Sequence, residues 1–484
     1  MDFMGEFPYG SMSSELSYGI FIRMIGVVYV VCFWSFAVQL PTLAGRHGLE
    51  PLCKSLATKR RHFGWRAFWY YPTLFWLFNT ELLLDTMLWV LPTLGCVCGG
   101  LVVYGGASTP YLLGACWLIL LSIDAGPTLL VYPWDSLLLE VGFLCLWLPG
   151  TRGFSGGLGS LEALHAPSPL HSFAFRWLAF RVLVGFGKLK FVGSEWRDRL
   201  YIRGFLINQP MVSPLGWWAH HALPDWVWVA SLGGMFVVEM VAPFGFFFTG
   251  LPRVVASASI AGLMVGIWAT GNYGYFNILT MALCMGAVDQ GVSAHLSFTS
   301  ADLLPPGSGP LFLSAASTST STSASSVGGG VLLPLLQRYL HLSPPTLATQ
   351  WPSLLLSTLL LTYILPLSAI LFVMNSWINM SWAFWGGVYR LRVHPALWWT
   401  QAYAGVLRSL QQFRVVAAYG VFPPHTSPSQ RWALVYEGSE DGVTFHRYHY
   451  KHYLSSPTTQ PAFIAPFHPR LDHAIFYESF GSAG

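Results

Sequence analysis

The stretch YGIFIRMIGVVYVVCFWSFAVQL, residues 18–40, decides the class of fold to which this chain belongs. Arg23 is its only charged residue, and the run reaches the roughly 20 apolar residues that a helix needs to cross a bilayer. No basic segment precedes it, so we expect a transmembrane helix and not a cleavable signal peptide. The loop at 46–66 is rich in Lys and Arg, so the positive-inside rule predicts that it lies on the cytosolic or matrix side, with the N-terminus opposite.

The composition of the whole chain extends this interpretation beyond the first helix. Charged residues make up 10% and hydrophobic residues 54%, whereas an ordinary soluble domain has about 25% charged residues. This excludes a typical soluble enzyme, a disordered protein and a nucleic-acid binder with a strongly basic face. We predict a polytopic membrane protein with about eight or nine spans, and 94–122 is either one long span or two short ones. The predicted spans are 18–40, 68–91, 94–122, 129–148, 173–192, 226–249, 254–270, 274–290 and 352–374.

The expected fold is mainly α, a transmembrane helical bundle with a small β-containing extramembrane domain at the C-terminus. The predicted organisation is an N-terminal segment, a bundle, a Ser/Thr/Pro-rich loop, a last transmembrane helix and an extramembrane tail, at 1–17, 18–290, 291–351, 352–374 and 375–484. Within the tail, 397–416 has the pattern of an amphipathic helix, and 431–450 predicts a β-hairpin turning at 438–442. Few charges occur in the tail, so we expect it to lie on the bundle, on lipid or on a partner.

Several charged residues fall within the predicted spans, where charge is costly. We expect Asp135 and Glu140 to pair with basic residues of the next span and fix the register of the helices. A pocket for a charged or lipid headgroup is the first alternative, and a catalytic acid/base site is the second. The predicted structural network comprises Asp135, Glu140, Arg176, Arg181 and Lys188.

No catalytic or metal-binding pattern accompanies these charges. A Gly-x-Ser-x-Gly nucleophile motif is absent, and all cysteines but Cys53 lie in apolar runs typical of buried thiols. His446, His449 and His452 would alternate between the two faces of a strand, which disfavours a zinc site. We therefore predict a protein that is not an enzyme and has no cofactor or metal, with structural phospholipids as the expected small-molecule partners.

Four groups of motifs follow one another along the chain. They are YPWDSLLLE at 132–140, the segment from Arg176-Trp177 through Arg181 and Lys188 to Asp198, GNYGYFN at 271–277, and the tail motifs YEGSEDG at 436–442 and PFHPRLD at 466–472. Together they resemble the lipase maturation factor family. The resemblance implies a multi-pass endoplasmic-reticulum membrane protein that assists the folding and assembly of secreted lipases without catalysis. It also implies that a non-membrane region, including the tail, binds the client lipase. The candidate residues for this contact, or for the integrity of the tail domain, are Tyr436, Glu437, Gly438, Asp441, His468, Arg470 and Asp472.

Two departures from the family pattern motivate other hypotheses. Gly204–Asn208 stands where the family carries a His-Tyr-Glu-Thr stretch, and the chain ends at Gly484 while the family tail continues. The second hypothesis is therefore an accessory subunit of a large membrane complex, such as a respiratory-chain complex of the mitochondrial inner membrane, that has lost the folding role. A third hypothesis is a membrane enzyme that uses the buried charges. The expected partners are lipids and either a client lipase or neighbouring subunits, and no nucleic acid.

Overall fold

The computed structural model describes residues 14–106, 108–127, 132–146, 169–192, 198–287, 364–373, 411–417, 419, 433–456 and 459–481. Helix α1, Ser14–Ala44, lies at the centre of the main core, and its side chains are buried against several neighbouring helices. A helix that is apolar all round requires such a central position. Its main neighbour is α4, Glu81–Tyr104. Gly26 and Gly99 allow the two helices to approach closely, since a Cβ built on Gly26 would lie 2.9 Å from the Gly99 carbonyl oxygen.

The region 67–125 differs from the predicted spans. Residues 68–91 are not one helix: the chain forms α3, Ala67–Tyr70, then a 3-10 turn at Leu74–Leu77, and α4 begins only at Glu81. Pro72 explains the interruption, because proline lacks the N–H that a continuing helix requires. Residues 94–122 belong to two helices, since α4 ends at Tyr104 and α5 spans Thr109–Ala125. Gly105 and Gly106 adopt positive φ angles in the turn between them.

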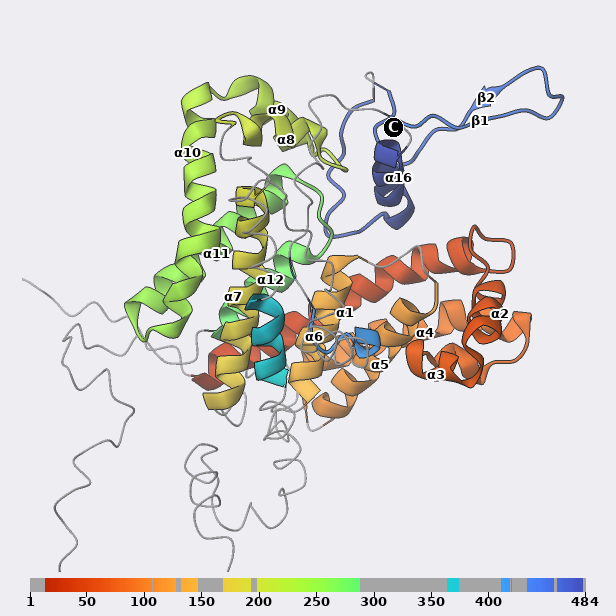
Figure 1. Ribbon diagram of the computed structural model, residues 1–484, viewed down its shortest axis with the longest axis horizontal. Coiled ribbons are helices and arrows are strands. Elements are labelled where there is room, and N and C mark those ends of the chain that lie inside the picture. Colours follow the sequence, from red (N-terminus) through yellow and green to blue (C-terminus); the bar gives the residue numbers. More distant parts are fainter. Residues whose placement is uncertain are drawn as a thin grey trace, which may run out of the picture.

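The remaining helices of the bundle surround this core (Figure 1). Helix α10, Asp225–Phe236, continues through a π-helical turn at Val237–Val241 and a 3-10 helix at Ala242–Phe247. Helices α8 and α9 lie across one end of α10. The bounds of the others are α2 Leu52–Phe63, α6 Pro133–Leu146, α7 Pro169–Val192, α8 Tyr201–Asn208, α9 Pro214–Ala222, α11 Leu251–Thr270 and α12 Phe276–Ala287.

Four helices within the described residues are long and apolar enough to cross a membrane, so the prediction of eight or nine spans is not confirmed. Over the described residues, helix α6 has 14 residues, compared with the roughly 20 that a bilayer requires. Helix α7 is long but carries Arg176, Arg181, Lys188 and Lys190. The four candidate spans are Leu16–Ala44, Glu81–Tyr104, Asp225–Phe247 and Leu251–Thr270, and shorter apolar helices cover Thr109–Ala125, Phe276–Ala287 and Ile364–Val373.

The C-terminal tail contains the predicted β-hairpin in shortened form. Strands β1, Glu437–Gly438, and β2, His446–Arg447, pair antiparallel, with Glu437 opposite Arg447. Helix α16, Arg470–Gly481, follows, and the hairpin extends away from it and from the bundle (Figure 1). Of the predicted amphipathic helix, 397–410 lies outside the described residues, and 411–413 form a 3-10 turn that ends before 416. The Ser/Thr/Pro-rich loop at 291–351 also lies outside them.

Candidate functional site

Helix α6 carries the two carboxylates around which the candidate site is built. Its N-terminus is set by Pro133, which favours the first turn of a helix because its φ angle is already helical. Asp135 lies in that first turn and accepts a hydrogen bond of 2.9 Å from the backbone N–H of Tyr132. Glu140 lies further along α6, and both side chains are almost completely buried. Such groups require partners, because an unpaired buried charge is strongly destabilising.

The partner of Asp135 is Arg470, at the start of α16 in the tail. The guanidinium donates two hydrogen bonds to the carboxylate, with Nη1–Oδ2 at 2.6 Å and Nη2–Oδ1 at 2.8 Å. Tyr275 adds a third donor to Asp135 through its hydroxyl. The guanidinium also lies 3.7 Å from the centre of the Phe36 ring of α1. This two-pronged geometry is the arrangement in which an arginine–carboxylate pair is strongest.

The backbone around Arg470 is held by side chains of the bundle. Gln39 of α1 donates to the His468 carbonyl at 2.8 Å and accepts from the Arg470 N–H at 2.8 Å. The Tyr132 hydroxyl donates to the Arg470 carbonyl at 2.7 Å. These bonds satisfy backbone groups that would otherwise be buried without partners, so α1 and α6 together form a socket for this segment of the tail.

Asn272, in the GNYGYFN motif, binds the tail backbone at a segment that lies a few residues before Arg470. Its Oδ1 accepts from the backbone N–H groups of Ile464 and Ala465 at 2.8 and 3.0 Å. Its Nδ2 donates to the Ala462 carbonyl at 2.9 Å. The GNYGYFN motif therefore binds the tail backbone through this side chain.

A second part of the tail docks on Glu140. The carboxylate pairs with Arg181 of α7, accepts from the Ala417 N–H at 3.0 Å and accepts from the Tyr419 hydroxyl at 2.5 Å. Arg181 in turn donates to the Ala417 carbonyl at 3.1 Å. Close by in the chain, Arg414 pairs with Asp124 of α5 at 2.8 Å. Acidic residues of two bundle helices thus hold two separate segments of the tail.

The structure places the five charged residues of the predicted network in different surroundings. Glu140 and Arg181 lie together. Asp135 instead pairs with the tail. Arg176 donates to the Ala287 carbonyl of α12 at 3.3 Å, and Lys188 lies 4.9 Å from the centre of the Phe372 ring. Sequence reasoning missed Arg470 and Arg414 as partners, because basic residues of the next span were plausible partners by charge.

The structure also places the predicted partner-contact residues of the tail in different surroundings. His468 and Arg470 are fully buried, so they hold the tail on the bundle and present nothing to a partner. Asp472 accepts from the backbone N–H groups of His452 and Tyr453 at 3.1 Å and joins α16 to the hairpin. The remaining four lie on the hairpin, and they are Tyr436, Glu437, Gly438 and Asp441.

Asp441 stabilises the hairpin turn from an exposed position. Its Oδ1 accepts from the backbone N–H groups of Val443 at 2.8 Å and Thr444 at 2.7 Å, and from the Ser439 hydroxyl at 2.8 Å. These hydrogen bonds favour the ionised carboxylate and hold the pKa of Asp441 well below its usual value.

His468 and His473 form a buried pair beside the socket, outside the four long apolar helices. His468 Nε2 lies 2.7 Å from His473 Nδ1, and His473 stacks on Tyr132 and Trp134. Burial disfavours the charged imidazolium, so it lowers the pKa of His468 well below the usual value and that of His473 to about 3. Both rings are therefore neutral in the folded protein.

Within the described part of the chain, no three or more His, Cys, Asp or Glu side chains gather as a metal site would require. All seven cysteines are free thiols. The acidic groups of the socket are engaged by arginine, tyrosine and backbone donors of the same chain. This arrangement is suited to holding two parts of a protein together.

Comparison with known proteins identifies the bundle. Residues 16–295 match the family model described as the lipase maturation factor transmembrane domain. The chain belongs to the lipase maturation factor family. Lipase maturation factor 2 of mouse is 27% identical over 97% of this chain and 73% of its own length. Human lipase maturation factor 2 is 30% identical over 57% of this chain and 40% of its own length. Bovine lipase maturation factor 1 is 29% identical over 60% of this chain and 51% of its own length. No solved structure matches the chain.

The matched family domain contains the socket but not the tail segments that occupy it. Asp135, Glu140 and Asn272 lie inside residues 16–295, whereas Arg470 and Tyr419 lie beyond them. The mouse relative aligns over nearly the whole chain and so includes the tail.

We predict that Arg470→Leu destabilises the protein and releases the tail. The substitution leaves Asp135 buried without its cation, which lowers the free energy of unfolding by about 3–5 kcal/mol. Thermal unfolding in detergent and limited proteolysis of the tail measure the two effects. The double variant D135L/R470L should recover part of the loss, because no unpaired charge remains.

Arg447→Leu is the matched control, since Arg447 lies on the exposed hairpin. Its effect should stay within about 0.5 kcal/mol, as for most surface substitutions. If Arg470→Leu melts and is cleaved like the wild type, the tail does not depend on the ion pair.

The neutral histidine pair predicts a loss of stability in weak acid. In the unfolded chain a histidine has a pKa near 6.5. Below that pH, the unfolded state therefore binds protons at these two histidines, whereas the folded state does not. Stability should fall by up to about 1.4 kcal/mol per pH unit for each histidine, from pH 6.5 towards the folded pKa of about 3 for His473. Melting temperatures between pH 7.5 and 5 measure this slope.

His473→Gln keeps a hydrogen-bonding side chain but removes one titrating group. The variant should melt with a shallower pH dependence between pH 6.5 and 5 than the wild type. Equal slopes for the two proteins would show that His473 does not contribute.

Proposed function

We propose that this protein is a non-catalytic folding factor of the endoplasmic-reticulum membrane that assists the maturation of secreted lipases. Membership of the lipase maturation factor family supports this proposal. The observation that carries it is an apolar surface on the tail hairpin, presented outside the bundle by a tail that is firmly docked. The ion pairs of the socket support a holding role, since a reaction needs a nucleophile, acid or base free to meet a substrate.

The hairpin surface consists of large apolar side chains that do not face the core. Their exposed fractions are 52% for Tyr436, 83% for Val443, 60% for Phe445 and 64% for Tyr448. Exposed apolar patches of this kind mark surfaces that bind other macromolecules. The hairpin protrudes from the molecule (Figure 1), so a folded or partly folded client can reach it.

The hairpin is joined to the bundle through a small core of its own. Tyr453, just after the hairpin, is buried against Ile475 and Phe476 of α16. Helix α16 begins at Arg470, which pairs with Asp135. A client bound to the hairpin surface is thereby tethered to the membrane bundle.

Contacts of α16 relate the tail to one end of α1. Leu471 and Ala474 line a small cavity together with Leu43 and Ala44 at the end of α1 and with Glu50 in the following loop. The tail and the basic loop at 46–66 therefore belong to the same side of the membrane in our proposal. A secreted client requires that side to be the lumen, opposite to the orientation that the positive-inside rule predicts from sequence.

Two of the basic residues in that loop are engaged by other groups. Arg46 pairs with Asp85 at 3.3 Å. Lys59 is buried and donates to the carbonyl oxygens of Ala125 and Gly126, and burial lowers its pKa. These contacts allow part of the basic charge to lie on the lumenal side with partners from the same chain.

We predict that Phe445→Asp on the hairpin surface weakens client binding without unfolding the protein. The charge disrupts an apolar contact, so co-purification of a co-expressed secreted lipase should fall by about tenfold or more, as expected for loss of a central apolar anchor. Secreted lipase activity in cells that lack the native protein should fall with it. The melting temperature should stay close to that of the wild type, because Phe445 is exposed.

Glu440→Ala is the matched control, because Glu440 is exposed in the same hairpin but is not apolar. It should retain wild-type lipase binding and secretion. Unchanged lipase secretion with Phe445→Asp would contradict a role of the hairpin surface, and unchanged secretion in a clean deletion would contradict the proposed function.

We further predict that tags in loop 46–66 and after residue 484 are protected from protease together in sealed microsomes. Shared protection follows if both face the lumen, and a tag before α1 should be cleaved. Cleavage of the two tags from outside intact microsomes would exclude contact between the tail and secreted clients. Recovery of the protein from mitochondria at fixed stoichiometry with a large complex would favour the accessory-subunit hypothesis instead.

A further inference from the structure

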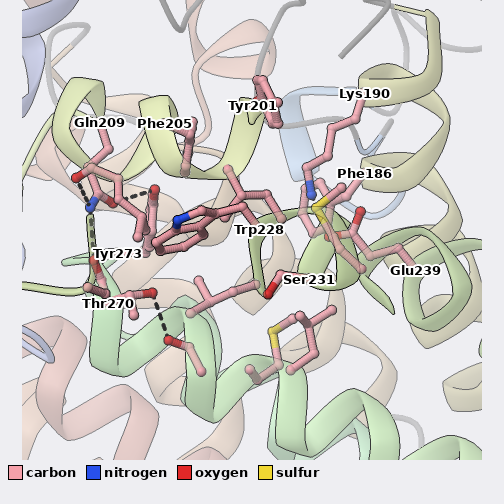
Figure 2. Close-up of a pocket in the computed structure, with 18 of the residues that line it drawn as sticks. Phe186, Lys190, Tyr201, Phe205, Gln209, Trp228, Ser231, Glu239, Thr270 and Tyr273 are labelled. Atoms are coloured by element: carbon pink, nitrogen blue, oxygen red, sulfur yellow. Dashed lines mark hydrogen bonds and ion pairs between the residues drawn. The ribbon is translucent and has the colours of Figure 1, made fainter. Parts of the chain in front are cut away.

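A cavity of about 410 Å³ lies among α7, α8, α9, α10 and α11, and Trp134 of α6 and Phe276 of α12 also line it. Most of its lining is apolar and includes Phe186, Phe205, Trp228, Met235, Met264 and Ile267. Figure 2 shows Gln209, Thr270 and Tyr273 on one side of Trp228, and Lys190 and Glu239 on the other. A volume of this size is within the range of small-molecule sites in proteins, roughly 300–1,000 Å³.

One end of the cavity carries an ion pair. Lys190 of α7 lies 2.5 Å from Oε1 of Glu239 in the π-helical turn that follows α10. Both side chains line the cavity (Figure 2). Single π-helical turns occur frequently at functional sites, and an ionisable residue within a candidate span marks a functional site by default.

The other oxygen of Glu239 has no donor within the described part of the chain. The Glu239 side chain is only 2% exposed, and its buried Oε2 makes no hydrogen bond there. A buried acceptor without a donor is costly. The opposite end differs, because the Tyr273 hydroxyl donates to Gln209 Oε1 at 2.8 Å and Gln209 Nε2 donates to the Thr270 carbonyl at 2.9 Å.

Glycines on one wall keep the cavity open. Gly262 and Gly266 of α11 line it, and a Cβ built on either glycine meets no atom within 4 Å. Larger side chains at these positions would project into space that the protein leaves empty. The wall can therefore be changed without disturbing a packed contact.

We propose that this cavity binds one acyl chain of a neutral lipid with a free hydroxyl group, a diacylglycerol. The hydroxyl donates to Glu239 Oε2 and accepts from Lys190, which satisfies both members of the ion pair. The acyl chain follows the apolar middle of the cavity towards Gln209 and Tyr273. A phosphate headgroup is disfavoured, because it would bring a second anion next to the Glu239 carboxylate.

The surroundings of the cavity provide a route for this ligand. The helices that carry its walls expose apolar side chains on their outer faces, including Val229 and Val237 on the α10 segment and Val265 on α11. These faces contact lipid when the helices span a membrane, so an acyl chain can enter from the bilayer. This inference does not depend on the proposed function, since it concerns a different part of the bundle.

The test uses the full chain in nanodiscs and a diacylglycerol with a diazirine in its acyl chain. We expect the photoproduct to map to peptides of α10 and α11. Gly266→Leu fills the cavity and should lower this labelling by about tenfold. Ser231→Leu, from the α10 wall, is a second variant that should act in the same direction.

Gly100→Leu is the matched control, since Gly100 is a helical glycine of α4 whose added Cβ also meets no atom within 4 Å, and it lies away from the cavity. It should label like the wild type, and melting temperatures of all variants verify folding. The proposal is overturned if folded Gly266→Leu and Ser231→Leu label like Gly100→Leu.

Two further probes test the headgroup and the chain. Phosphatidic acid with the same diazirine chain should label the cavity several-fold less than diacylglycerol. Equal labelling by phosphatidic acid would overturn the assignment of a neutral hydroxyl headgroup. Stronger labelling by a photoactivatable sterol would overturn the assignment of an acyl chain.

Discussion

The buried ion pair between Asp135 and Arg470 connects the tail to the membrane bundle, and the rest of the architecture depends on it. Both side chains are withdrawn from water, which is unfavourable unless geometry and further hydrogen bonds compensate. Two guanidinium bonds, the Tyr275 hydroxyl and the Phe36 ring provide that compensation. Because either charge alone would be strongly destabilising, the pair permits one position of the tail and disfavours others.

The second docking point of the tail, at Glu140, is also a buried carboxylate with several donors. Glu140 holds Arg181, Ala417 and Tyr419, so the tail is attached through acids of α6 at two places that are far apart in sequence. This explains why the tail contains so few charges: much of its polar chemistry is used against the bundle. The hairpin is the part that remains exposed, and its apolar side chains account for our assignment of client binding to it.

The buried acids of the bundle differ in how completely their carboxylate oxygens are hydrogen-bonded. Asp135 and both oxygens of Glu140 are fully engaged by the chain itself, which is the state expected of structural charges. Glu239 is engaged through one oxygen and faces an apolar cavity with the other. Asp124 Oδ1 also lacks a donor within the described residues, so what distinguishes Glu239 is that its side chain lines the large apolar cavity, where a ligand can reach it.

The sequence by itself determined the membrane class, the hairpin and the family, because apolar runs, turn residues and ordered motifs are local signals. It did not determine the number of spans, since Pro72 interrupts the predicted span at 68–91 and the sequence left 94–122, which turns at Gly105 and Gly106, open as one span or two. Only the tertiary structure decided the partner of Asp135. The two residues are 335 positions apart, and Arg176, Arg181 and Lys188 of α7 were equally plausible by charge. Which cation reaches a buried acid depends on how distant segments pack, and that information is not carried by any single stretch of sequence.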